Sequence, residues 1–166
     1  MMKFFLLLLL CPLMALATDL PTGFNGMPWG APLANLPNAQ KIAESKLFQC
    51  HRSGDGSATV ANTIVSNVRL CFAGDRFYFA QMEFTGRLAY EQLLAHGKSG
   101  WGEPKPGQRF TDAFVWGGPE QGVYVELEFS KIDDRGTLVY VYLPVYKETQ
   151  EASKPDRSKL RPGSGF

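Results

Sequence analysis

The sequence predicts an α+β fold in which a mostly antiparallel sheet of about five strands packs against two helices. Segments that alternate apolar and polar residues, as half-buried strands do, occur on both sides of a segment with helical spacing. Short connections rich in Gly and Asp join successive strands, as expected for antiparallel hairpins. The expected order is helix, two strands, helix, three strands, or α-β-β-α-β-β-β.

The first half of the expected domain contains one helix and one hairpin. Residues 32–44 are predicted to form a short helix that a proline interrupts. Strands are predicted over residues 60–72 and 77–84, where the apolar residues alternate with polar ones. Gly74-Asp75 between these strands suits a type II′ turn, so the two strands are expected to pair as a hairpin.

The second half begins with a helix and ends with three strands. Tyr90, Leu93 and Leu94 fall at helical spacing, which predicts a helix over residues 87–96 with Gly97 as its stop signal. After this helix, apolar residues alternate with polar ones and no longer recur at helical spacing. The three strands are predicted over residues 109–116, 122–130 and 137–146.

The connection between the last two strands fixes their expected register. It suits a three-residue loop with Gly136 in the left-handed conformation and Asp133 opposite Thr137. The expected core pairs are Val125 with Val145, Leu127 with Leu143, and Phe129 with Val141. The opposite face then carries four tyrosines and two glutamates: Tyr124, Glu126, Glu128, Tyr140, Tyr142 and Tyr146.

These six residues are the candidate ligand-binding residues of the chain. A tyrosine offers a flat apolar ring and a polar tip, so a row of tyrosines beside carboxylates suits a binding platform. The same pattern also fits tyrosines that cover a sheet face or lie beneath a helix.

Glu126 and Glu128 also raise the alternative of a small hydrolase. Two residues apart on one strand face, their carboxylates fall within the separation of about 5–9.5 Å that glycosidases use. Against this alternative, strands with alternating Glu are common, the chain has no G-x-S-x-G elbow, and its only histidines are His51 and His96. The sequence therefore assigns no catalytic residue and no cofactor.

The N-terminus has the pattern of a secretory signal peptide over residues 1–17. Lys3 precedes an apolar run that ends in Ala15-Leu16-Ala17, so cleavage is expected after Ala17. The run is shorter than the roughly 20 residues that a membrane span needs. Lipoprotein processing at Cys11 is an alternative, although bulky Leu10 before it fits poorly. The expected location is the periplasm or the outside of the cell.

After this segment, a single domain over residues 18–146 and a disordered charged tail over residues 147–166 are expected. Lys3 is the only charged residue of the signal, so the mature chain has as many acidic as basic residues. This balance argues against a nucleic-acid partner, because binding to phosphates needs a basic face.

Two cysteines, Cys50 and Cys71, remain after the signal is removed. An even pair in an oxidising compartment predicts one disulfide bond. The alternative is a metal site in which His51 and His96 join the two cysteines. It lacks the closely spaced ligand pairs of structural zinc sites, so no metal site is assigned.

Each of the three tryptophans is followed by a glycine and, two residues after that glycine, by a proline: Trp29, Trp101 and Trp116. Such a frame holds an indole beside a chain reversal, either as a core anchor or as a ring that stacks on a ligand. The segment 24–33, with Leu94, Gly97, Gly102-Glu103-Pro104 and Trp116, resembles a loose group of small exported bacterial proteins of unknown function that begin with F-x-G-x-x-W-G. The resemblance implies an α+β domain in the cell envelope and no mechanism.

The sequence thus predicts an exported binding or assembly domain without catalytic activity. Its expected partner is an envelope protein or a glycan. The alternative is the small envelope hydrolase that would use Glu126 and Glu128.

Overall fold

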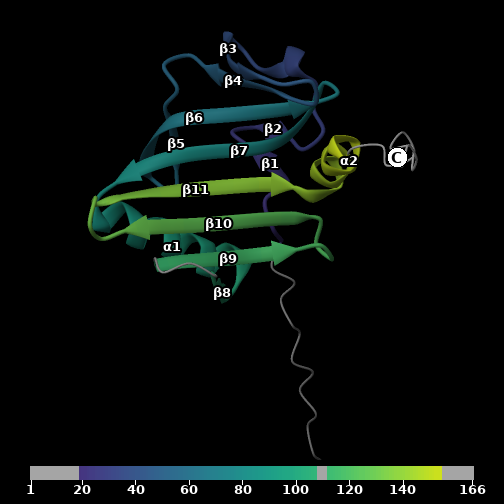
Figure 1. Cartoon of the computed structure of the whole chain (residues 1–166). Coiled ribbons are helices and arrows are strands. Elements are labelled where there is room, and N and C mark those ends of the chain that lie inside the picture. Colours follow the sequence, from purple (N-terminus) through teal and green to yellow (C-terminus); the bar gives the residue numbers. More distant parts are fainter. Residues whose placement is uncertain (1–18, 108–111, 155–166) are drawn as a thin grey trace, which may run out of the picture.

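The computed structural model describes residues 19–107 and 112–154, and its dominant feature is one large antiparallel sheet (Figure 1). The predicted signal peptide, its expected cleavage site and Cys11 lie outside the described residues. The strands are β1 (Gly23–Phe24), β2 (Met27–Pro28), β3 (Ala39–Glu44), β4 (Gln49–Ser53), β5 (Ala58–Val60), β6 (Thr63–Ala73), β7 (Arg76–Thr85), β8 (Lys105–Pro106), β9 (Asp112–Gly118), β10 (Val123–Ser130) and β11 (Arg135–Tyr142). The helices are the 3-10 turn η1 (Leu33–Asn35), α1 (Arg87–Trp101) and α2 (Leu143–Ser153).

Nine of the described strands form the large sheet, in the order β3-β4-β6-β7-β11-β10-β9-β8, with β5 paired to β6. The α+β class and the two helices are confirmed, whereas the expected count of five strands is wrong. After β7 the chain crosses the sheet as α1 and returns through β9, β10 and β11, so that β11 pairs with β7. Strands far apart in the sequence are therefore neighbours at the centre of the sheet.

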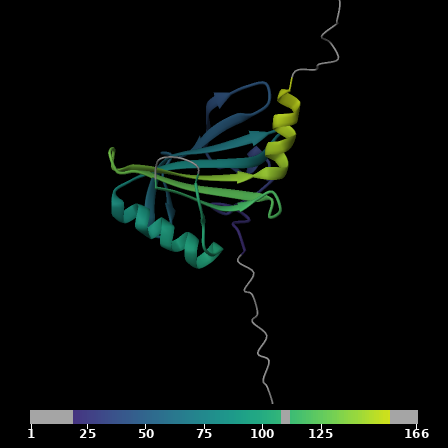
Figure 2. The same cartoon turned by 60° about the horizontal axis from the view of Figure 1, so that its bottom comes forward.

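One face of the sheet, called the inner face below, packs against α1 and the short hairpin β1-β2 (Figures 1 and 2). The ring of Phe129 on β10 stacks between Phe84 of β7 and Tyr90 of α1, with ring centroids 6.2 and 4.9 Å apart. Leu93 of α1 and Val125 of β10 are buried in the same cluster. This cluster is the main hydrophobic core.

Helix α1 is longer than the sequence indicates, because Gly97 does not end it. A Cβ atom at Gly97 would lie 2.5 Å from the indole of Trp116. The glycine therefore leaves room for the Trp116 ring to pack against the helix, and it does not form a turn. The helix continues to Trp101 and ends before Gly102, which has a φ of 85°. The Trp116 indole also donates a hydrogen bond of 2.8 Å to the carbonyl of Gly102.

The three Trp-Gly frames share one backbone feature. Gly30, Gly102 and Gly117 have φ values of 80°, 85° and 75°, which only glycine adopts readily. All three indoles pack in or against the main core. The frames therefore place core anchors at chain reversals, the first of the two interpretations given above.

The opposite face, called the outer face below, has α2 at one end only (Figures 1 and 2). Val145 of α2 is 2% exposed and packs in a second cluster with Cys50, Cys71 and Tyr78. The expected disulfide is confirmed, since Cys50 on β4 is bonded to Cys71, its direct partner on β6.

Of three local predictions for the first half, two are wrong and one is confirmed. Residues 32–44 form η1 and the edge strand β3 instead of a helix, and all six residues of β3 are exposed. The hairpin β6-β7 is confirmed. Its turn is of type I′, because both Gly74 and Asp75 have positive φ, at 54° and 62°.

The end of the chain also differs from expectation. The last strand stops at Tyr142, and Leu143–Ser153 is helical, with Pro144 in the first turn, where a missing N–H is tolerated. Residues 147–153, expected in a disordered tail, thus belong to α2. Residues 155–166 lie outside the described residues. No helix in the part of the chain described here is both long and apolar enough to cross a membrane.

Candidate functional site

The part of the outer face that α2 leaves uncovered is the candidate site of this protein. Paired residues of antiparallel strands lie on the same face, so the strand register gives the order of side chains across the sheet. One row consists of Glu83 on β7, Thr137 on β11 and Glu128 on β10. The next row towards α2 consists of Gln81, Val139 and Glu126. All six side chains are half-buried.

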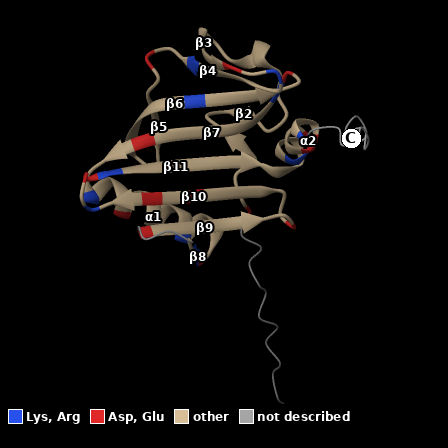
Figure 3. Cartoon of the chain, in the orientation of Figure 1, with Lys and Arg blue, Asp and Glu red and all other residues tan. Residues whose placement is uncertain are grey.

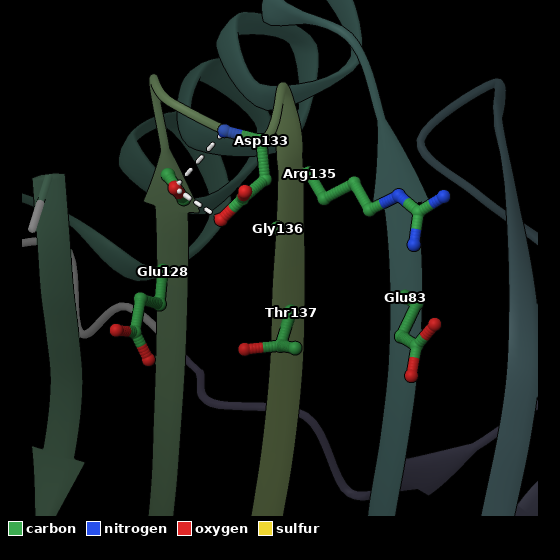
Figure 4. A pocket seen from close by; sticks show the side chains of 7 residues that line it. Glu83, Glu128, Asp133, Arg135, Gly136 and Thr137 are labelled. Carbon is green, nitrogen blue, oxygen red and sulfur yellow. Dashed lines mark hydrogen bonds between the residues drawn. The ribbon is translucent and has the colours of Figure 1, made fainter.

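A hollow of about 650 Å³ lies over the first of these rows. Figure 4 shows Glu83, Thr137 and Glu128 pointing into it from three neighbouring strands, with Arg135 and Asp133 at its rim. Strands lie about 4.8 Å apart, so the Cα atoms of Glu83 and Glu128 are roughly 10 Å apart with the Thr137 hydroxyl between them. The hollow therefore presents two carboxylates and a hydroxyl on a rigid floor of paired strands.

The connection between β10 and β11 shapes one wall of this hollow. Ser130 donates a hydrogen bond of 3.0 Å to the Asp133 carboxylate and accepts one of 3.3 Å from the Asp133 amide (Figure 4). The positive φ of this turn, 51°, belongs to Asp134 and not to Gly136. The turn is therefore closed by its own side chains.

The register expected for β10 and β11 is wrong, and the candidate tyrosines are not in one row as a result. Val125 pairs with Tyr140 and Leu127 with Leu138, an odd shift from the expected register that exchanges the two faces of β11. Tyr140 is 3% exposed in the main core, and its burial raises the pKa of the phenol. Tyr142 lies on the inner face, where its ring stacks on Trp29 at 6.2 Å.

The other candidate residues lie on the outer side, but only some lie together. Tyr124, Glu126 and Glu128 project from β10 onto the outer face, and the Tyr124 hydroxyl donates a hydrogen bond of 3.1 Å to Glu126. Tyr146 is on α2 and is 38% exposed. Of the six candidate residues, Glu128 alone lines the large hollow.

Glu83, Thr137 and Arg135 were missed by sequence reasoning. Glu83 is a charged residue at an alternating position of β7, which marks it as outward-facing. Its neighbours on β11 follow only from the pairing of β7 with β11, which no local turn specifies.

The cysteines and histidines of the described residues lie away from this hollow. Both cysteines are joined in the disulfide. His51 is buried, and neither ring nitrogen has a hydrogen-bond partner among the described residues. His96 on α1 packs edge-on against Trp101 at 5.4 Å. Residues 19–107 and 112–154 hold no group of three or more His, Cys, Asp or Glu placed to bind a metal ion.

Charge is distributed unevenly across the outer face. Basic side chains stand on β4 and β6, and acidic ones on β7 and β10 (Figure 3). The arrangement can bind a ligand that carries charges of both signs along its length. No protein-family model matches the chain, and no curated protein or solved structure is detectably similar to it.

Proposed function

We propose that this protein is an exported binding or assembly domain, without catalytic activity, that holds a partner on its outer sheet face. The observation that carries the proposal is the uncovered half of that face, which presents Glu83, Thr137 and Glu128 in one row over a hollow of about 650 Å³. A structural sheet with two buried faces would carry apolar residues at these positions. Here five of the six outward positions in the two rows are polar, and Val139 is the exception.

Export is part of the proposal. It is supported by the signal-like pattern of residues 1–17 and by the disulfide between Cys50 and Cys71, a bond that forms and persists in oxidising compartments. The resemblance to small exported bacterial proteins, stated above, would place the protein in the cell envelope. The periplasm or the cell exterior is therefore the proposed location.

The composition of the face favours a protein segment over a glycan as the partner. Sugar rings are bound by stacking on exposed aromatic side chains, but Tyr140 and Tyr142 lie on the inner face. The two candidate tyrosines on the outer side, Tyr124 and Tyr146, do not line the hollow. The charged side chains instead suit a polypeptide with basic residues over the carboxylates. A glycan partner is an outcome that the experiment below separates from this one.

Site-directed photo-cross-linking in the native cell envelope tests the proposal. A benzophenone amino acid is placed at Thr137 in the hollow and, as a matched control, at Leu88, which is 69% exposed at the start of α1. Position 137 is expected to give a discrete cross-linked protein that position 88 does not give. No product at position 137, or equal products at both positions, would contradict the proposal. A glycan adduct would show that the partner is a glycan and not a protein segment.

The hydrolase alternative has its own test. Glu126→Gln with Glu128→Gln should leave folding intact because both side chains are half-buried on the outer face. A hydrolase would lose turnover of glycan substrates in this variant. The proposal predicts that the native chain has no such turnover.

A further inference from the structure

A second hollow, of about 320 Å³, lies on the outer face beside the first, and Glu83 lines both. Its lining includes Ile42 of β3, Arg52 of β4, Asn67 and Arg69 of β6, and Gln81 of β7. The two arginines form the basic side of the outer face (Figure 3). Their arrangement differs from that of an ordinary charged surface in three respects.

First, the strand register places the two arginines next to each other. His51 pairs with Leu70, and one further step along β4 and β6 brings Arg52 beside Arg69 on the same face. Like charges directly opposite each other on a sheet are destabilising. An anion between the two guanidinium groups would remove that repulsion.

Second, the guanidinium groups have few acceptors within the described chain. Hydrogen bonds from Ser57 chiefly lower the pKa of Asp55, and the charge of Arg52 adds a smaller effect, but the Asp55 carboxylate accepts its hydrogen bonds from Ser57. The Nε of Arg52 is buried without a hydrogen-bond partner, and its Nη2 donates only a long bond of 3.4 Å to Gln40. Arg69 is exposed and makes no hydrogen bond or ion pair with another described side chain. A buried N–H without an acceptor is unfavourable, so the site favours a ligand that supplies one.

Third, the carboxylate in the lining bonds to an amide of the same lining and not to either arginine. Glu83 accepts a hydrogen bond of 2.7 Å from the side-chain amide of Asn67. Asn67 lies in a β-bulge between Ser66 and Arg69 and has a φ of 50°. Bulges re-aim side chains beside functional sites, and this one turns Asn67 towards Glu83 while Arg69 faces the hollow.

From these three observations we infer that Arg52 and Arg69 form an oxyanion site that holds a carboxylate or phosphate group of the partner. Guanidinium groups bind both anions through paired hydrogen bonds in a fixed plane. The inference rests on the proposed function, because it names what the basic side of the same binding face recognises. A partner would then place an anionic group between β4 and β6 and basic or hydroxyl groups over Glu83 and Glu128.

The test follows the arginine Nε–H signals of the full mature chain by NMR. Inorganic phosphate and acetate are titrated separately at constant ionic strength, with chloride as the balancing anion. The Arg52 and Arg69 signals are expected to shift together and to saturate. Tighter binding of phosphate would assign a phosphoryl group as the natural ligand, and tighter binding of acetate a carboxylate.

Variants establish whether the pair is responsible. Arg69→Gln, at an exposed position, should weaken the binding by about tenfold or more, and Arg52→Lys should also weaken it because the planar fork is lost. Arg76→Gln is the matched control, since Arg76 on β7 lines neither hollow and its guanidinium is already in an ion pair with Glu148 of α2. It should leave the binding unchanged.

Several results would overturn the inference. These are shifts that fail to saturate, equal shifts at Arg76, or full binding by Arg69→Gln. If the anion titration fails while the cross-link at position 137 forms, the oxyanion site is wrong and the proposed function stands. If the titration succeeds and no cross-link forms, the site binds anions but the face is not the partner surface.

Discussion

The ring of Phe84 lies directly against Gly136, its paired residue on the neighbouring strand. A Cβ atom on Gly136 would be 2.1 Å from Cζ of that ring and 2.4 Å from the carbonyl oxygen of Glu128. Gly136 is therefore required because the Phe84 ring and the Glu128 carbonyl leave no room for a side chain, and not because a turn needs it. This contact explains why the sequence suggested the wrong loop, and it fixes the register that places Thr137 between Glu83 and Glu128.

Gly136→Ala should destabilise the protein, because neither the ring nor the backbone carbonyl can move away without disturbing the sheet. Overpacking of this kind typically costs about 1–3 kcal/mol. Chemical denaturation measures the loss. Thr137→Ala, on the opposite face of the same strand, should change the free energy of unfolding much less. Equal stability of native protein and Gly136→Ala would refute the packing described here.

Two glycines of α1 give a second, internally controlled prediction. Gly97→Ala places a methyl group 2.5 Å from the Trp116 ring and should destabilise the protein by about 1–3 kcal/mol. Gly100→Ala meets no atom within 4 Å and should stabilise it by up to about 1 kcal/mol, because alanine is the better helix former. Thermal melts of both variants measure the two changes in stability. The same sign of change in both would mean that Trp116 does not rest on Gly97.

The disulfide is expected to contribute about 3 kcal/mol by constraining the unfolded chain, given the separation of 21 residues between its cysteines. Cys50→Ala with Cys71→Ala is the cleaner variant, because serines would bury two hydroxyl groups in the cluster under α2. Denaturation of native and variant protein measures the difference. Free thiols in the unreduced native chain would contradict the bond.

Because His51 is buried, the free energy of unfolding is expected to fall on acidification. Burial of the ring lowers its pKa below the usual 6.5, the positive charge of Lys41 adds to this, and Glu44 opposes it. Below about pH 6.5 the unfolded chain takes up a proton that the folded chain does not, so stability falls as the pH decreases towards the lower pKa of the folded state.

The measurement is the free energy of unfolding between about pH 7.5 and pH 5, compared with that of His51→Phe. The variant should show a smaller loss over this range, since its ring cannot take up a proton. Parallel curves for the two proteins would show that His51 has the same pKa in both states.

The sequence predicted the elements that local patterns specify. The hairpin of β6 and β7, the position of α1 and the disulfide follow from alternation, helical spacing and an even number of cysteines. Strand β3 was missed because all of its residues are exposed, so no alternation marks it. The site was only partly found, because the partners of Glu128 depend on the pairing of β7 with β11, which only the packed structure specifies.

The most direct test of the central claim is the yield of the cross-link at position 137 in three chains. The first has no other change, the second carries Glu83→Lys and Glu128→Lys on the outer face, and the third carries Glu91→Lys and Glu103→Lys on the α1 side. The two variants change the net charge equally. The account predicts that the second chain loses the product by about tenfold or more while the third keeps it. Equal yields in the two variants would contradict a partner surface on the outer face.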